Sequence, residues 1–146
     1  MRGLDDFKVG DVLVHEGWPI TADAIVAFAR EFDPQPFHLD PSAPETALTG
    51  GLIASGWHVA AILMRTMCDA FLIDSTCMGS PGVDSLKWLK PVRPGDTLTA
   101  RTTVTEVKPS RSRPDRGIVR LKHEVSNQAG DVVMVVDNPV LFGRRP

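Results

Sequence analysis

An aspartate and a histidine lie five residues apart in the segment DPQPFH, as Asp33 and His38. Its two prolines, Pro34 and Pro36, fix φ and exclude a continuous helix, so the loop between them is stiff. A stiff loop can hold a carboxylate and an imidazole within hydrogen-bond reach of one water. A histidine with a pKa of about 6.5 suits proton transfer near neutral pH. The pair alone allows two interpretations: acid–base chemistry, or a turn in which Asp33 is a cap and His38 packs at the loop edge.

A second candidate is the segment 50–56, GGLIASG, which leads into a long apolar stretch. The first N–H groups of a helix have no internal partner and carry partial positive charge. A glycine at such a position lets a ligand carbonyl approach the backbone, as an oxyanion site requires. A simple glycine hinge into a helix is the alternative interpretation.

The elements that must position these groups follow from local patterns. Residues 11–20 have the β-branched content and partial alternation of a strand. Thr21 is a favourable N-cap for a helix that must end at Asp33, since the residue before a proline avoids the α region. Residues 34–50 are expected to form a loop. Residues 51–72 carry the longest helical pattern and predict a central, mostly buried helix.

The second half of the chain has the character of a β-sheet. Four strands are predicted, at residues 83–89, 97–107, 117–125 and 132–142, separated by turn signals. Their short connections predict that the four are antiparallel neighbours. One long helix against an antiparallel sheet indicates an α+β fold. No repeat or linker is visible, so residues 1–146 are expected to form a single domain.

Composition excludes several classes of protein. The 146 residues carry a net charge of −2 and are 42% hydrophobic, which gives no electrostatic case for nucleic acid or an anionic membrane. No stretch approaches the roughly 18 apolar residues of a membrane span, and the N-terminus lacks the apolar core of a signal peptide. Cys68 and Cys77 lack metal-binding spacing, so we expect reduced thiols, a cytoplasmic location and no metal site.

Five segments, in order, resemble one known family. They are FKVGD at 7–11, DPQPFH at 33–38, GLIASG at 51–56, PVRPGDTL at 91–98 and NQAGDVVM at 127–134. Gly56 is the eighteenth residue after His38. This arrangement resembles the MaoC-like, (R)-specific enoyl-CoA hydratase family over nearly the whole chain.

The resemblance implies a hotdog fold, in which an antiparallel sheet wraps a central helix, and a homodimer whose sheets join. It implies Asp33 and His38 as the catalytic pair and the backbone N–H of Gly56 as the oxyanion donor. The implied reaction is reversible hydration of a trans-2-enoyl thioester to the (R)-3-hydroxyacyl thioester. No cofactor is expected, since coenzyme A is part of the substrate and the thioester already acidifies C2.

Substrate contacts are expected around the opening of the central helix, from Gly51, Ile53, Ser55, Trp57 and Met64. Two other functions stay open. The hotdog fold also serves acyl-CoA thioesterases, and a fold by itself does not choose between the two chemistries. A non-catalytic acyl-CoA-binding subunit is the second alternative.

Four positions depart from the family pattern. Phe32 and Gln35 stand where a glycine and an asparagine are common, and Ser55 replaces a histidine. In some relatives a serine hydrogen-bonds to the aspartate from the position that is Met64 here. The departures leave both catalytic side chains in place and bear on chain-length preference and efficiency.

Other charged groups have simpler interpretations. The basic segment 108–116 has three interpretations: a contact for coenzyme A phosphates, a contact for RNA, or a solvated hairpin loop. It lacks the aromatic residues that stack on bases, which favours the solvated loop. His58 is expected to pack in the protein or at a dimer interface, with a ligand contact as the alternative. His15 and His123 are expected on the strand surface.

Overall fold

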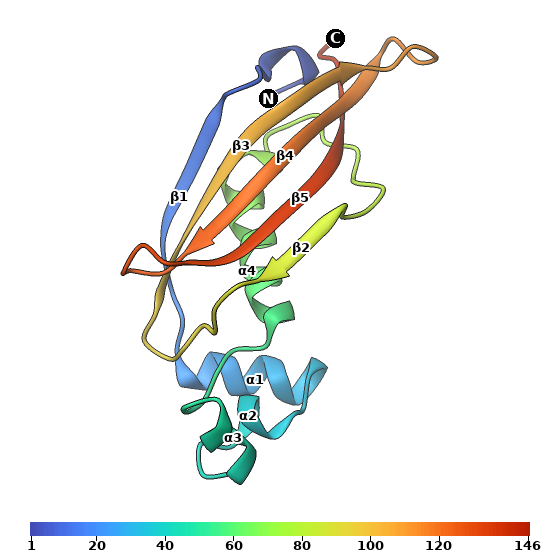
Figure 1. Cartoon of the computed structure of the whole chain (residues 1–146). Helices are drawn as coiled ribbons and strands as arrows, with labels where there is room; N and C mark the ends of the chain where they lie inside the picture. Colours follow the sequence, from blue (N-terminus) through green and yellow to red (C-terminus); the bar gives the residue numbers. More distant parts are fainter.

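A five-stranded antiparallel sheet forms the body of the molecule (Figure 1). The computed structural model describes residues 1–146, except the side chain of Glu16. The strands are β1 (Val12–Pro19), β2 (Ser85–Trp88), β3 (Thr97–Pro109), β4 (Arg116–Ser126) and β5 (Val132–Gly143). Their order across the sheet is β1-β3-β4-β5-β2, and every neighbouring pair is antiparallel.

One helix, α4 (Gly56–Met67), packs against a face of the sheet and continues in a π-helical turn, Cys68–Leu72. Three shorter helices gather below the sheet in Figure 1: α1 (Ala22–Phe32), α2 (Pro36–Leu39) and α3 (Pro44–Leu48). A 3₁₀ turn, Leu4–Asp6, precedes β1. The helix against the antiparallel sheet confirms the predicted α+β class and the hotdog fold.

The first helix follows its local signals. The Thr21 hydroxyl accepts a hydrogen bond from the N–H of Ala24 at 3.1 Å and caps the helix N-terminus. Ile25 and Ala29 are its buried residues. The helix stops at Phe32, and Asp33 takes φ −151° and ψ 70°, as the following proline requires. The predicted cap and end of this helix are both confirmed.

The prediction that residues 34–50 form only a loop was wrong, because α2 and α3 lie within them. Pro36 and Pro44 exclude a continuous helix, but each stands in the first turn of a short one. A proline is well tolerated there, since first-turn N–H groups have no acceptor within the helix. The stiff loop therefore presents His38 from a single helical turn.

The central helix starts later than the pattern predicted, at Gly56 instead of Gly51. Gly51 has a φ of +126°, which does not belong to a helix. The segment before α4 is instead tied sideways, with Ile53 N–H bonded to the carbonyl of Phe37 at 3.1 Å and Ala54 N–H to that of Val92 at 2.8 Å. These bonds attach the start of α4 to α2 on one side and to the segment after β2 on the other.

The predicted neighbour relation between the second and third strands was wrong. β2 pairs with β5, Leu86 opposite Val136, while β3 lies between β1 and β4. β4 and β5 lie between β3 and β2, so the connection must cross three inter-strand spacings, about 15 Å at roughly 4.8 Å each. The connection 89–96 can cross this distance, because an extended chain advances about 3.3 Å per residue. A short connection therefore did not imply pairing here.

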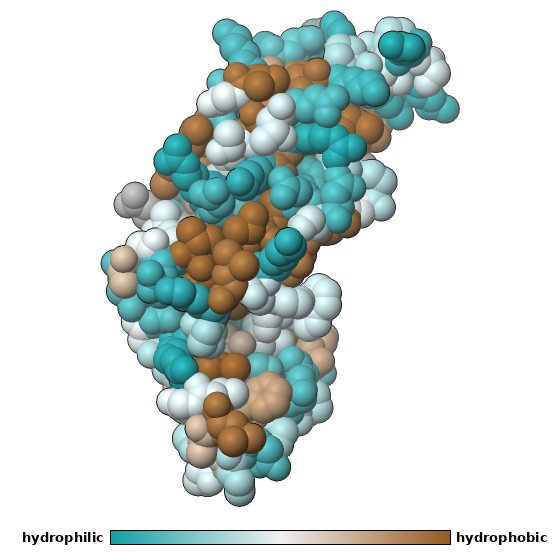
Figure 2. All heavy atoms as spheres, viewed as in Figure 1, coloured by the Kyte–Doolittle hydropathy of each residue, from teal (hydrophilic) through white to brown (hydrophobic). Residues whose placement is uncertain are grey.

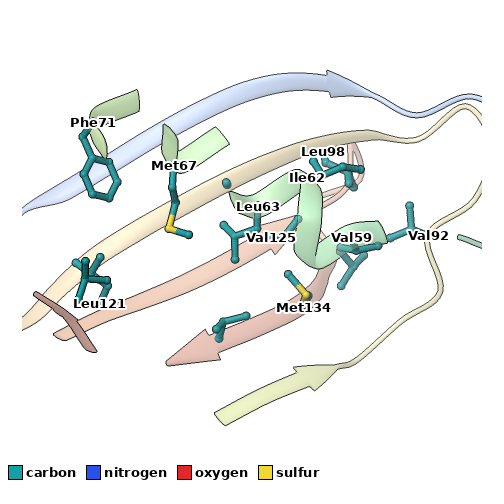
Figure 3. Packing of buried hydrophobic residues seen from close by; sticks show 14 of the residues in the cluster. Val59, Ile62, Leu63, Met67, Phe71, Val92, Leu98, Leu121, Val125 and Met134 are labelled. Carbon is teal, nitrogen blue, oxygen red and sulfur yellow. The ribbon is translucent and has the colours of Figure 1, made fainter. Parts of the chain in front are cut away.

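The core lies between α4 and the facing side of the sheet (Figure 3). Residues alternate strictly along β4, where Val119, Leu121 and Val125 are buried, whereas Arg120 and Lys122 are exposed. The core residues of the helix and its π turn share one face, and they are Val59, Ile62, Leu63, Met67 and Phe71. Figure 2 shows that hydrophobic residues also gather on the surface at the lower end of the sheet.

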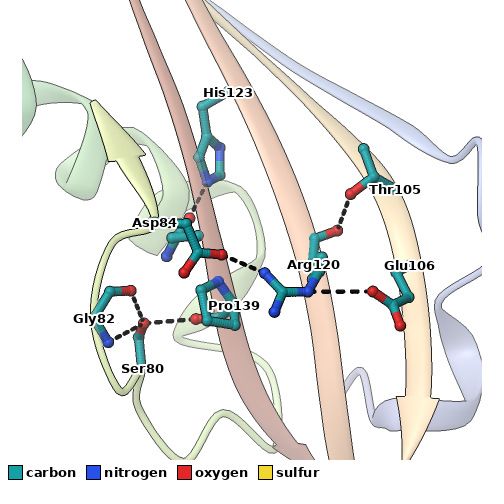
Figure 4. Close-up of polar contacts among 9 residues, drawn as sticks. Ser80, Gly82, Asp84, Thr105, Glu106, Arg120, His123 and Pro139 are labelled. Atoms are coloured by element: carbon teal, nitrogen blue, oxygen red, sulfur yellow. Dashed lines mark hydrogen bonds and ion pairs between the residues drawn. The ribbon is translucent and has the colours of Figure 1, made fainter. Parts of the chain in front are cut away.

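His123 is buried, so its predicted place on the strand surface was wrong. It shares the inward register of Leu121, not the outward register of Arg120, which lies between Asp84 and Glu106 in Figure 4. Its Nε2–H donates to Asn138 Oδ1 at 2.9 Å, and its Nδ1 accepts from the Thr102 hydroxyl at 2.8 Å. Burial lowers its pKa, although the Asn138 hydrogen bond and nearby Asp137 oppose this.

Asn138→Ala is expected to reduce the free energy of unfolding by about 2 kcal/mol, because it leaves the buried Nε2–H of His123 without its acceptor. Urea unfolding measures the loss. Lys122→Ala, on the exposed face of β4, is the control and should change stability by less than about 0.5 kcal/mol. Equal losses in the two variants would contradict a stabilising role for the buried hydrogen bonds.

None of the helices in the described part of the chain combines the length and the apolar character that crossing a membrane requires.

Candidate active site

A pocket of about 420 Å³ opens where the start of α4 meets α2 and the end of β2. Its polar end brings together Asp33, Gln35, His38 and Gly56. Residues that are far apart in sequence therefore meet in one space, and both sequence-predicted segments contribute to it.

The rest of the pocket is largely apolar. Ala54, Val59, Val92 and Val133 line it and are each less than 8% exposed. They come from three places: the segment before α4 and its first turn, the segment after β2, and β5. This end can accommodate a hydrocarbon chain, whereas the polar end offers titratable groups.

The opening of the pocket is formed by larger side chains that reach solvent. Trp57, Trp88, Leu89 and Lys90 line it and are partly or largely exposed. The two indole rings meet edge to face, with centroids 5.1 Å apart. Neither Trp88 nor the residues after it were predicted as site residues, because nothing in their local sequence placed this edge strand beside α4.

His38 is held in one tautomer. Its Nδ1 lies 2.7 Å from the carbonyl oxygen of Ile53, and a carbonyl can only accept, so Nδ1 carries the hydrogen. Its Nε2 faces Asp33, whose Oδ2 is 3.2 Å away: this nitrogen donates to the carboxylate when the ring is protonated and is an acceptor when the ring is neutral. The imidazole is only 5% exposed, so its orientation is fixed by packing as well. Nε2 is the atom free to accept a proton.

Two neighbouring side chains orient the carboxylate of Asp33 by donating hydrogen bonds to it. Its Oδ2 accepts from the Ser55 hydroxyl at 2.7 Å, and its Oδ1 accepts from Gln35 Nε2 at 2.7 Å. Burial acts to raise the pKa of this carboxyl, but the hydrogen bonds from Ser55 and Gln35, together with nearby His38, outweigh it and leave the pKa below its ordinary value. Asp33 is therefore a carboxylate at neutral pH and can act as a proton acceptor.

Ser55 takes a different place from the one predicted. It was expected to contact substrate, but its side chain is fully buried and its hydroxyl is bonded to Asp33. The family resemblance placed a serine that bonds to this aspartate at the position of Met64. Here Ser55, immediately before α4, makes the same kind of bond from the N-cap position. The sequence signal was a hydroxyl beside the predicted helix start, but its direction could not be known.

Gly56 is the first residue of α4, so its N–H has no acceptor within the helix. The glycine was expected to let a ligand approach the backbone. In the structure, a Cβ added at this position would lie 2.4 Å from Cε2 of Trp88. The indole therefore occupies the side-chain space of residue 56, while the backbone of Gly56 still lines the pocket.

The other predicted substrate contacts divide into two groups. Ile53 and Trp57 line the pocket, whereas Gly51 and Met64 are not among the described residues that do. Gly51 N–H is bonded to the carbonyl of Thr46 at 3.0 Å. Met64 is 50% exposed, on the face of α4 that turns away from the core. The prediction treated α4 as buried on several sides, but in this chain only one face packs against the sheet.

Two further groups from the sequence lie outside the pocket lining. The imidazole of His58 stacks on Phe28, with centroids 4.7 Å apart and planes 6° from parallel, and burial lowers its pKa. The basic segment 108–116 forms the hairpin between β3 and β4, at the end of the sheet opposite α1 (Figure 1). Within one chain this hairpin is far from the pocket, which favours its interpretation as a solvated loop.

The pocket can hold a small electrophile in a defined way. A carboxylate and an imidazole face one space, and in its neutral form the imidazole is a second acceptor, so that a water can donate to each. The first turn of α4 offers an N–H with partial positive charge, which suits an oxygen that becomes negative during a reaction. The apolar end can hold the remainder of an acyl chain.

Comparisons with known proteins agree on one family. Residues 7–127 match the family model described as MaoC like domain. The solved structure of a MaoC-like dehydratase from Rhodospirillum rubrum is 46% identical, covers 100% of this chain and 99% of that one, and has a TM-score of 0.92. The (R)-hydratase from A. caviae involved in PHA biosynthesis is 25% identical, with 93% and 96% covered and a TM-score of 0.69.

A curated relative is the mesaconyl-CoA hydratase of Cereibacter sphaeroides. It is 27% identical over 99% of this chain, but the match covers only 42% of the longer protein. The similarity therefore concerns less than half of that hydratase.

Proposed function

This chain belongs to the MaoC-like domain family, and we propose that it catalyses the reversible addition of water to a trans-2-enoyl thioester, giving the (R)-3-hydroxyacyl thioester. Its relatives support an enzyme of the hydratase or dehydratase kind in general terms. The observation that carries the specific proposal is the Asp33–His38 pair, oriented in one pocket with the first residue of α4.

The catalytic pair would bind the reacting water by both of its hydrogens. Ionised Asp33 and neutral His38 each offer an acceptor, and the two acceptor atoms are 3.2 Å apart. As the water oxygen bonds to C3, one member of the pair takes a proton from it, and a proton is delivered to C2 on the same face of the double bond. The product gains OH at C3 and H at C2, and the pair returns to its starting state.

Gly56 would stabilise the charge that develops during this step. When oxygen attacks C3, electrons move toward the thioester carbonyl, whose oxygen becomes an enolate. The Gly56 N–H and the positive end of α4 would face that oxygen. A single well-placed donor of this kind lowers the barrier by roughly 3 kcal/mol.

The substrate in this proposal is an acyl-CoA thioester. Its acyl chain would lie along the apolar end formed by Val59, Val92 and Val133, and its pantetheine would leave by the open end, beside Trp57 and Lys90. No metal or redox cofactor enters the proposed reaction, because the thioester itself acidifies C2. A cytoplasmic location, in keeping with the free thiols of Cys68 and Cys77, is part of the same proposal.

We also propose that the protein forms a homodimer, as the family resemblance implies. The short strand β2 lies at an edge of the sheet. Exposed hydrophobic residues lie in or beside this strand, namely Val83, Trp88 and Leu89, and on α4, where Met64 is exposed. An exposed apolar surface beside an edge strand is suited to association with another chain. Sedimentation of a species with twice the chain mass of 15.9 kDa would support this.

Crotonyl-CoA tests the proposed reaction directly. Loss of absorbance at the enoyl band without release of free thiol is the expected result. Release of free coenzyme A without hydration would mean a thioesterase and would overturn the proposal. Saturable binding without either reaction would mean a non-catalytic binding subunit, which also contradicts it.

Ser55→Ala is expected to move the acid limb of the kcat/KM profile to higher pH and to lower kcat about tenfold. The Ser55 hydroxyl lowers the pKa of Asp33, so its removal raises that pKa. Asp33 then stays protonated, and unable to accept a proton, up to a higher pH. Initial rates with crotonyl-CoA, measured between about pH 4 and 9 so that the range includes the ordinary pKa values of aspartate and histidine, locate the acid limb.

The matched control is Ser42→Ala. The Ser42 hydroxyl donates to Asp40 Oδ1 at 2.7 Å and lowers the pKa of that exposed carboxyl, but neither residue lines the described pocket. The acid limb should stay in place in this variant. An unchanged limb in Ser55→Ala as well would contradict the assignment of Asp33 as the ionised acceptor.

A further inference from the structure

Trp88, the last residue of β2, lies directly over Gly56. Its Nε1–H donates to the Gly56 carbonyl at 2.9 Å. A Cβ built on residue 56 would lie 2.4 Å from Cε2, 2.6 Å from Nε1 and 2.8 Å from Cδ2 of the indole. Real Cβ atoms do not approach other atoms this closely, so the ring excludes every side chain at position 56. Trp88, and not only a ligand, requires the glycine.

The position of the indole is itself fixed on two sides. The indoles of Trp88 and Trp57 pack edge to face, at an interplanar angle of 82°. On the backbone side, Trp88 is paired with Met134 where β2 meets β5. The next residue, Leu89, donates its N–H to the carbonyl of Val133 at 2.8 Å. Trp88 therefore connects β5 to the first turn of α4.

We propose that Trp88 is a positioning residue that aims the Gly56 N–H at the thioester oxygen. This inference rests on the proposed hydration. The Gly56 N–H and carbonyl belong to the two peptide groups that flank one Cα. The second of these groups belongs to α4, but at the helix start a glycine allows the group that carries the N–H an unusually wide range of orientations. By binding the carbonyl and covering the Cα, the indole removes that freedom and leaves the N–H in one direction. An oxyanion donor must be held in this way to act on the transition state.

Trp88→Phe tests the hydrogen bond, since it keeps a ring over Gly56 but removes the N–H. With crotonyl-CoA, kcat should fall about five- to tenfold while KM changes less than about twofold, because the affected contact strengthens only in the transition state. Trp18→Phe is the matched control, because Trp18 is on β1 and is not among the described residues that line the pocket. Its kcat should stay within about twofold of that of the unaltered protein.

A double variant tests the steric pairing. Gly56→Ala should lower kcat at least about 100-fold, because the new Cβ and the indole cannot both keep their places. Trp88→Ala makes room for that Cβ at the cost of the support. The double variant Gly56→Ala/Trp88→Ala should therefore be at least about tenfold more active than Gly56→Ala alone. A double variant that is no more active than Gly56→Ala would overturn the inference. A Trp88→Phe variant with full kcat would also overturn it.

Unfolding in urea gives a second readout that does not depend on the reaction. The midpoint shift caused by Gly56→Ala should be less than half as large in the Trp88→Ala background as in the unaltered chain. Equal shifts in the two backgrounds would also overturn the inference. If the unaltered protein fails to hydrate crotonyl-CoA while the shifts remain unequal, the proposed function fails and the contact between positions 56 and 88 stands as a structural one.

Discussion

Asp33→Asn is expected to lower kcat for crotonyl-CoA hydration by about 1,000-fold while the fold stays intact. The amide keeps the size of the side chain but carries no charge and cannot take a proton from water. The two donors that now orient the carboxylate, from Ser55 and Gln35, would also have to share one remaining oxygen. Initial rates under saturating substrate measure the loss, and the urea midpoint checks the fold.

Asp40→Asn is the matched control for this prediction. Asp40 follows α2 directly, and its carboxylate accepts hydrogen bonds from the backbone and hydroxyl of Ser42. It shares the proline-stiffened region with Asp33, but it does not line the described pocket. Activity should stay within about twofold in this variant. A near-normal rate in Asp33→Asn would show that the carboxylate serves the loop and not the reaction.

His38→Ala is expected to have an effect of similar size, again about 1,000-fold on kcat. The substitution removes Nε2, the one basic atom that faces Asp33, and also the Nδ1–H bond to the Ile53 carbonyl. Loss of that bond in a buried place should reduce stability by about 1 kcal/mol, so rates must be compared at a temperature where the variant is folded. His15→Ala, on β1, is the control with unchanged activity.

The combination of both changes separates a catalytic pair from two independent groups. If Asp33 and His38 act on one water, the double variant should be no slower than the slower single variant, because either change already disables the pair. Multiplied losses would mean that each residue acts alone. A normal rate in His38→Ala would exclude the proposed role of the imidazole.

The structure also explains how this chain can depart from the pattern of its relatives. Position 64 holds a methionine instead of a serine, which could have left Asp33 without a hydroxyl donor. Ser55, the residue immediately before α4, supplies that donor, and Gln35 donates a second hydrogen bond to the carboxylate. The orientation of Asp33 is therefore kept by different residues.

Much of the fold could be predicted from local patterns. The N-cap at Thr21, the end of α1 before Pro34 and the strands of the second half each depend on residues a few positions apart. The family resemblance and the hotdog fold, inferred from five short segments, are confirmed. The pairing of β2 with β5 was missed, because a connection that is long enough can lead to either edge of a sheet.

The sequence by itself determined the chemistry available at the site: a carboxylate and an imidazole on a stiffened loop, and a glycine before an apolar helix. Only the tertiary structure decided which side chains support them. Ser55 bonds to Asp33 across 22 residues of chain, and Trp88 bonds to Gly56 across 32. Likewise, the buried place of His123 depended on which side of the sheet α4 covers. Local propensity cannot encode such contacts, because they depend on how the connections cross between α4 and the sheet.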